Sequence, residues 1–146
     1  MRYRHERFGA IVASDEPAVL AYIDTELCGE LGIAPSPLWQ EPPREVLSAP
    51  TEAHLMVTRR CPLSCSHCYT SSSPDAGEDL STSELERRID ALAERKVFHL
   101  AMGGGEAFLR PDLIHLAQYA RARGVTPSLT TMGGLLTEEL AGRCAG

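Results

Sequence analysis

The sequence lacks any uninterrupted apolar run long enough to span a bilayer, and its amino terminus leads into no signal-peptide core. Positive charge is also scarce, because 14 Lys and Arg residues stand against 20 Asp and Glu residues, for a formal net charge of -6. No basic stripe is available to neutralise phosphates, which argues against general nucleic-acid binding. We therefore expect a cytoplasmic protein that partners neither nucleic acid nor a membrane.

Cysteine is infrequent and odd in number, with five residues in 146, and three of the five are clustered. Cofactor ligation fits this pattern better than disulfides do, since cytoplasmic thiols stay reduced. The clustered residues are Cys61, Cys65 and Cys68, spaced C-x3-C-x2-C. Three thiolates this close in sequence can reach one inorganic centre from a single loop. They are one short of the four ligands of a saturated iron–sulfur or zinc site, so one metal position stays open for a ligand that is not protein.

The chain changes character at a proline-rich stretch, 35–52, which reads as an extended linker or wrapping segment. Residues 1–34 predict a small β-hairpin, with strands at 8–13 and 18–23, followed by a short helix. Residues 53–146 alternate strands with helices, which predicts an α/β fold with a parallel sheet and right-handed crossovers.

Within the second part, three loops follow strand ends. The expected elements are a strand at 53–58, a helix at 82–96 whose Ser81 and Glu84 form a capping box, a strand at 97–102, a helix opened by Pro111 and ended by Gly124, a strand at 125–131, and a helix from Thr137. The carboxyl ends of parallel strands form the edge at which such folds bind ligands. We therefore expect the cysteine loop, the turn Gly103-Gly104-Gly105-Glu106 and the turn 132–134 to converge on one site.

The segment 61–69 resembles the cluster loop of the radical S-adenosylmethionine (radical SAM) enzymes, whose motif is C-x3-C-x2-C. That family usually has an aromatic residue before the last cysteine, and His67 fills the place here. Gly104, Gly105 and Glu106 match the family's Gly-Gly-Glu motif. The resemblance covers the chain after the proline-rich stretch. It implies the first three βα units of a partial (β/α)6 TIM-like barrel, so we expect a fragment, a truncated gene product or half of an assembly.

The resemblance implies that Cys61, Cys65 and Cys68 hold three irons of a [4Fe-4S] cluster, and that the fourth iron chelates S-adenosylmethionine. In that mechanism the reduced cluster cleaves S-adenosylmethionine to a 5′-deoxyadenosyl radical, which takes a hydrogen atom from the substrate. An electron donor such as flavodoxin or ferredoxin is implied by the same chemistry. Zinc ligation by the three cysteines and a histidine such as His54 or His99 is the alternative metal chemistry.

The resemblance implies that the Gly-Gly-Glu turn contacts the ammonium group in the methionine part of S-adenosylmethionine. Glycine lets the backbone approach a ligand closely, and a carboxylate complements a cation. His67 and Tyr69, which flank the last cysteine, are expected near the adenine or simply over the cluster. Ser128 and Thr130 are candidates for contacts to the ribose or the methionine carboxylate, with plain strand hydroxyls as an equal alternative.

Two positions depart from the family pattern, because Ala107 replaces a frequent proline and Met132 replaces a frequent asparagine. A less rigid turn and the loss of the asparagine's hydrogen bonds are the expected consequences.

Residues 4–12 resemble the opening of the PqqD-like leader-peptide recognition domain, which captures a ribosomally made peptide by adding a strand to a sheet edge. A hairpin that merely packs against the barrel is an equal alternative. Residues 108–113 after the glycine turn are typical of the peptide-maturing (SPASM-type) branch of the family. A ribosomal peptide is therefore the expected substrate, and a non-catalytic leader-peptide-binding fragment is a further alternative.

Overall fold

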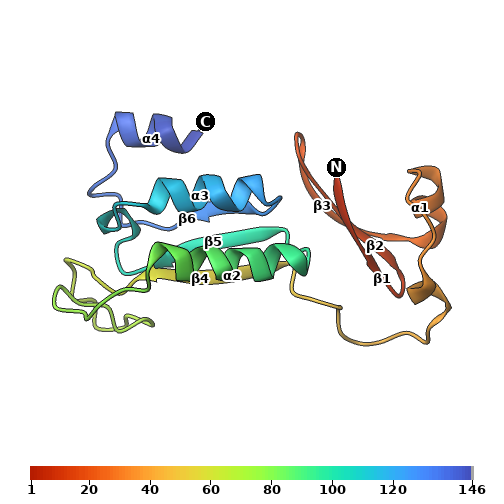
Figure 1. Ribbon diagram of the computed structural model, residues 1–146, viewed down its shortest axis with the longest axis horizontal. Coiled ribbons are helices and arrows are strands. Elements are labelled where there is room, and N and C mark those ends of the chain that lie inside the picture. The colour runs from red at the N-terminus through yellow and green to blue at the C-terminus, as the bar shows by residue number, and fades with distance from the viewer. Residues whose placement is uncertain (146) are drawn as a thin grey trace. The chain divides into compact units, whose positions relative to one another are not determined.

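The computed structural model describes residues 1–145, and the chain divides into two compact units, Met1–Pro50 and Thr51–Gly146. Figure 1 colours the first unit red to orange and the second yellow to blue. Among the described residues, no helix combines the length and the apolarity that crossing a membrane requires.

The first unit is an antiparallel sheet in the order β1-β2-β3, formed by β1 (Arg2–Glu6), β2 (Gly9–Asp15) and β3 (Ala18–Asp24). A short helix, α1 (Thr25–Glu30), follows, and the Asp24 carboxylate caps it by accepting a hydrogen bond from the backbone N–H of the third residue along the chain. The hairpin of β2 and β3 and the helix are confirmed. Strand β1 was not predicted, so the expected two-stranded hairpin is in fact a three-stranded sheet.

The proline-rich stretch wraps around the first unit. The short helix η1 (Pro37–Gln40) packs Trp39 against the core, and its indole Nε1 donates a hydrogen bond to the Gly9 carbonyl oxygen at 2.8 Å. The buried Arg4 donates to the Ala49 carbonyl oxygen at 2.6 Å and pairs with the buried Glu6 carboxylate at 2.8 Å. These contacts explain why a segment without strands of its own stays attached to the sheet.

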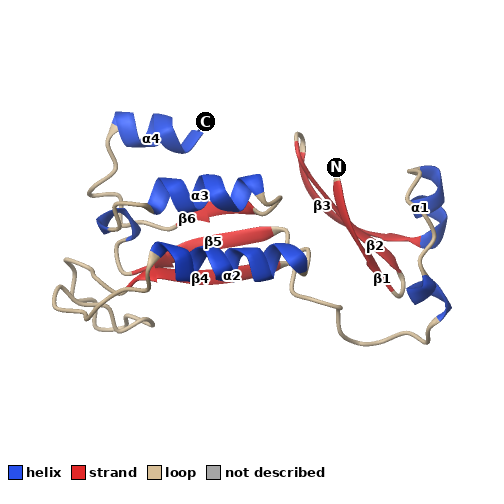
Figure 2. Ribbon diagram, in the orientation of Figure 1, coloured by secondary structure: helices blue, strands red, loops and turns tan. Residues whose placement is uncertain are grey.

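The second unit is a parallel sheet in the order β4-β5-β6, formed by β4 (Glu52–Thr58), β5 (His99–Gly104) and β6 (Thr126–Leu129). The helices α2 (Thr82–Glu94) and α3 (Leu113–Ala122) lie side by side over one face of this sheet (Figure 2). Three parallel strands with helical crossovers confirm the α/β prediction.

The local signals explain the helix boundaries of the second unit. The predicted capping box is present, because the Ser81 hydroxyl accepts from the Glu84 N–H and the Glu84 carboxylate accepts from the Ser81 N–H. Helix α3 begins two residues after Pro111, and Gly124 follows its end with a positive φ of 79°. The remaining elements are the helical turn η2 (Ala107–Leu109) and the helix α4 (Glu138–Ala145).

The core of the second unit lies between the sheet and its two helices. It is built from aliphatic side chains of β4, α2, β5 and α3 that are almost fully buried: Leu55, Val57, Leu85, Ile89, Leu100, Met102, Leu113 and Leu116. The opposite face of the sheet carries no such cover, since His54, Met56, Ser128 and Thr130 are exposed there. Within the described residues of the second unit, this face of the sheet is therefore exposed next to its carboxyl edge.

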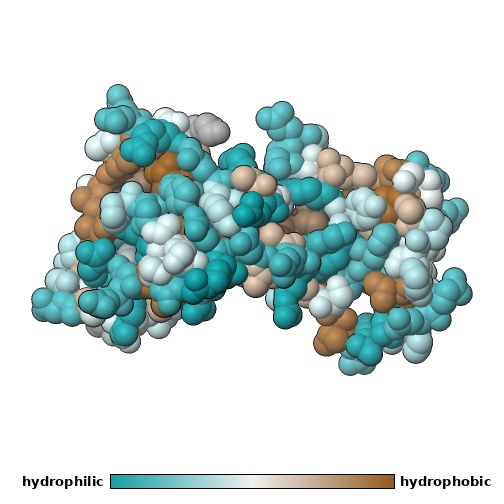
Figure 3. All heavy atoms as spheres, in the orientation of Figure 1, coloured by the Kyte–Doolittle hydropathy of each residue, from teal (hydrophilic) through white to brown (hydrophobic). Residues whose placement is uncertain are grey.

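Exposed apolar side chains follow β6. Met132, Leu135 and Leu136 have 45%, 38% and 44% of their surface accessible. Figure 3 shows hydrophobic surface near α4, among otherwise mostly hydrophilic atoms.

Candidate functional site

The cysteine loop, residues 59–80, runs from the end of β4 to the start of α2 and is the yellow-green loop of Figure 1. Its two arms are joined by a parallel bridge between Arg60 and Ser73. The Cys61 N–H donates to the Ser73 carbonyl oxygen at 3.1 Å, and the Ser73 N–H donates to the Arg59 carbonyl oxygen at 3.2 Å. These hydrogen bonds therefore hold the backbone of Cys61 at the base of the loop.

The three cysteines share the loop, but their thiols do not gather at one point. Cys65 is exposed, and Cys61 and Cys68 are partly buried. A turn links the last two, because the Cys68 N–H donates to the Cys65 carbonyl oxygen at 3.2 Å. Within residues 1–145, no three His, Cys, Asp or Glu side chains lie close enough to hold one metal ion. The ligand set thus stays a prediction, and the same holds for a zinc set that includes His54 or His99.

Cys68 has the most polar surroundings of the three thiols. Its sulfur lies 3.2 Å from the Thr70 hydroxyl and accepts a hydrogen bond from the Ser72 N–H at 3.4 Å. Hydrogen bonding from Thr70 and then from Ser72 lowers the pKa of the Cys68 thiol to about 7. Because the thiolate is the form that ligates metal, this environment suits a cluster ligand.

The glycine turn packs directly on the start of the cysteine loop. The Gly105 N–H donates to the Thr58 carbonyl oxygen and the Glu106 N–H donates to the Arg60 carbonyl oxygen, both at 2.9 Å. A Cβ atom on Gly104 would overlap the Thr58 carbonyl oxygen, and one on Gly105 would overlap the Arg60 carbonyl oxygen. The glycines are therefore required for the close approach of this turn to the backbone of Thr58 and Arg60, whereas the sequence suggested a close approach to a ligand.

The Glu106 side chain points into the protein and is 1% exposed. Its carboxylate accepts hydrogen bonds from the Phe108 N–H at 3.0 Å, the Thr131 hydroxyl at 2.7 Å and the Met132 N–H at 2.9 Å. Met132 thus contributes its backbone to this network. The carboxylate links the glycine turn to the loop after β6, and its direct contact with an ammonium group stays a prediction.

A cavity of about 380 Å³ opens on the uncovered side of the sheet, beside the glycine turn. This volume lies within the usual range for small-molecule sites. Its lining includes predicted residues and one that sequence reasoning missed: Gly104, Tyr69 and Thr130 were candidates, and Arg59 was not. The signal for Arg59 was its position as the first residue after β4, on the way to the first cysteine.

His54, a candidate for the zinc set, also lines this cavity, whereas the side chains of His67 and Ser128 lie outside its lining. His67 is exposed on the cysteine loop, next to the Ser66 hydroxyl at 3.4 Å, and Ser128 is exposed on β6. Their proposed contacts with the cofactor stay predictions.

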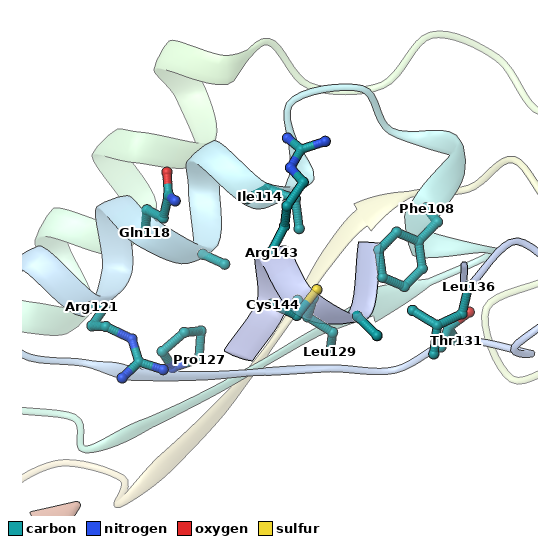
Figure 4. Close-up of a pocket in the computed structure, with 12 residues that line it drawn as sticks. Phe108, Ile114, Gln118, Arg121, Pro127, Leu129, Thr131, Leu136, Arg143 and Cys144 are labelled. Atoms are coloured by element: carbon teal, nitrogen blue, oxygen red, sulfur yellow. The ribbon is translucent and has the colours of Figure 1, made fainter. Parts of the chain in front are cut away.

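A second cavity, of about 440 Å³, lies between α3, β6 and α4 (Figure 4). Apolar side chains such as Phe108, Leu129 and Leu136 line most of it, together with Arg121 and Arg143. None of the three clustered cysteines lines this cavity. The three cysteines do not line the smaller cavity either, but Tyr69 and Thr70, which follow Cys68, and Gly104 of the glycine turn do.

The family model described as the radical SAM superfamily matches residues 55–145 of the chain. The chain belongs to this superfamily. Membership implies a [4Fe-4S] cluster and S-adenosylmethionine as cofactors, and it covers the cysteine loop, the glycine turn and the loop after β6.

Two relatives and one solved structure extend this comparison. Mycofactocin maturase MftC of Mycobacterium tuberculosis is 38% identical over 99 residues, which are 68% of this chain and 25% of that protein. PqqA peptide cyclase of Bradyrhizobium diazoefficiens is 35% identical over 96 residues, which are 65% of this chain and 25% of that protein. The chain thus spans about a quarter of the length of these curated relatives.

The crystal structure of Streptococcus suis SuiB bound to the precursor peptide SuiA has a TM-score of 0.67 and 14% sequence identity. The match covers 97% of the present chain and 43% of the SuiB chain. At this identity the likeness concerns the fold, and it includes both units.

We predict that Gly105→Ala destabilises the second unit by about 1–3 kcal/mol, since the added methyl group must displace the Arg60 carbonyl. Denaturant unfolding monitored by circular dichroism measures the change. Gly77→Ala is the matched control, because it lies in the cysteine loop with nothing within 4 Å of the added Cβ. Equal stability of the two variants would contradict the close-contact account.

Proposed function

We propose that the second unit is the first part of a radical SAM catalytic core in which Cys61, Cys65 and Cys68 hold a [4Fe-4S] cluster. The observation that carries this proposal is the glycine turn, which is hydrogen-bonded to the base of the cysteine loop and borders the 380 Å³ cavity. Cys61, Cys65 and Cys68 would hold the cluster, which together with S-adenosylmethionine would supply the radical chemistry that removes a hydrogen atom from a substrate.

The residues of this chain fit such a cofactor. Three thiols lie on one loop, and hydrogen bonds at one of them favour the thiolate. Arg59 and Thr130 line the cavity, and their guanidinium and hydroxyl groups would bind the carboxylate and the hydroxyls of a nucleoside–amino acid ligand. Tyr69, which is 80% exposed, would cover a flat base.

A ribosomally made peptide is the substrate class that we propose. The relatives include a PqqA peptide cyclase, and the SuiB structure that resembles both units holds a precursor peptide. In the first unit, β3 is an edge strand with exposed Val19 and Tyr22, which suits addition of a peptide strand. Flavodoxin or ferredoxin would supply the electron.

Metal analysis tests the cluster proposal. After anaerobic reconstitution, the chain is expected to hold about four irons and four sulfides. Cys61→Ala, Cys65→Ala and Cys68→Ala should each lose most of the iron, whereas Cys144→Ala should keep it. For protein made in zinc-poor, iron-rich medium, retained zinc without bound iron would overturn the proposal in favour of a zinc module.

Peptide binding tests the substrate class. The probes are fluorescein-labelled candidate leader peptides, with the precursor peptide SuiA of the similar SuiB structure among them. Tyr22→Ala should weaken binding of the recognised peptide roughly two- to five-fold, because the peptide strand would lose its cross-strand contact with the Tyr22 side chain. Tyr69→Ala is the matched control on the cysteine loop and should bind as the wild type does. Failure of every peptide to bind, or equal loss in both variants, would contradict a leader site on β3.

A further inference from the structure

Arg110 is a buried cation, 6% exposed, that the chemistry described so far does not use. It lies between η2 and α3, and its Nη1 donates to two backbone carbonyl oxygens: that of Val57 at 2.9 Å and that of Leu80 at 2.8 Å. Val57 is the penultimate residue of β4, and Leu80 is the last residue of the cysteine loop. The Arg110 guanidinium therefore links the end of β4 to the last residue of the cysteine loop.

An acidic partner keeps this guanidinium in place. Arg110 Nη2 donates a hydrogen bond to Asp112 Oδ2 at 2.9 Å. Arg110 Nε forms an ion pair with Asp112 Oδ1 at 2.8 Å, but it makes no hydrogen bond. The Thr82 hydroxyl donates to the same carboxylate at 2.6 Å. Burial acts to raise the pKa of Asp112, but the hydrogen bonds from Arg110 and Thr82 outweigh it and lower the pKa. The charged form of the Asp112 carboxylate is therefore favoured.

Asp79, near the end of the cysteine loop, also connects the two ends of this loop. The Asp79 carboxylate accepts hydrogen bonds from the Thr58 hydroxyl at 2.8 Å, the Arg59 N–H at 3.1 Å and Arg60 Nε at 3.2 Å. We call this region, formed by residues 57–60 and 79–80, the loop neck. Arg110 differs from Asp79 because it reaches the neck from the segment that carries the glycine turn.

We propose that Arg110 is a positioning residue that closes the loop neck and so holds Cys61, Cys65 and Cys68 in place relative to the glycine turn. The inference rests on the proposed cluster function. Joining the ends of a long loop removes many of its conformations, and ligands must be held closely to bind a metal centre. The planar guanidinium serves two carbonyls and a carboxylate at once, which a lysine ammonium on its flexible stem does not reproduce.

Hydrogen exchange on the metal-free chain tests the neck itself. In Arg110→Met, the amides of Cys61 and Ser73, which bridge the two arms, should exchange roughly ten-fold faster or more, because hydrogen bonds to a charged group are lost. Arg110→Lys should give a smaller increase. Arg123→Met is the matched control, since Arg123 also pairs with a carboxylate, Asp90, at 2.7 Å, but far along α3 from the neck. Its exchange at the two amides should equal that of the wild type.

Iron content and electron paramagnetic resonance (EPR) provide the second measurement. Reconstituted Arg110→Met should hold at most half of the wild-type iron and give a weaker, broader signal, while Arg123→Met should match the wild type. Wild-type exchange rates and wild-type iron in both Arg110 variants would overturn the inference. If Arg110→Met does not fold, Arg110→Lys decides by the same criteria. If the wild type binds no iron, the proposed function fails, and the exchange rates still decide whether Arg110 closes the neck.

Discussion

The backbone contact between the glycine turn and the base of the cysteine loop is the constraint on which the site depends. Two hydrogen bonds, from Gly105 to Thr58 and from Glu106 to Arg60, bring the ends of β4 and β5 together more closely than side chains would permit. Any larger residue at these glycines would separate the two loops. The backbone of the glycine turn and that of the base of the cysteine loop are therefore in direct contact.

Two buried polar side chains extend this contact to the rest of the carboxyl edge. Glu106 binds the loop after β6, and Arg110 binds the end of β4 and the last residue of the cysteine loop. Each of these buried polar side chains makes several hydrogen bonds, as burial of a polar group requires. The segment from β5 to α3 is thus the centre of the site, and the loops on either side are attached to it.

Part of this arrangement was predictable from the sequence. The capping box of Ser81 and Glu84 and the glycine turn are local signals, and the alternation of strands and helices placed three loops at one edge. The direction of the Glu106 carboxylate was not predictable, because its donors Thr131 and Met132 come from the loop after β6, about 25 residues further along the chain. Strand β1 was missed because its pattern is polar, and Arg110 was missed because its carbonyl partners are distant in sequence.

The central claim is that three cysteines leave an iron open for S-adenosylmethionine next to the glycine turn. Low-temperature EPR of anaerobically reconstituted, dithionite-reduced protein tests it most directly, with and without S-adenosylmethionine. We expect a [4Fe-4S]⁺ signal whose shape changes when S-adenosylmethionine is added. A cluster signal that stays unchanged at saturating S-adenosylmethionine would contradict an open, ligand-accessible iron at this site.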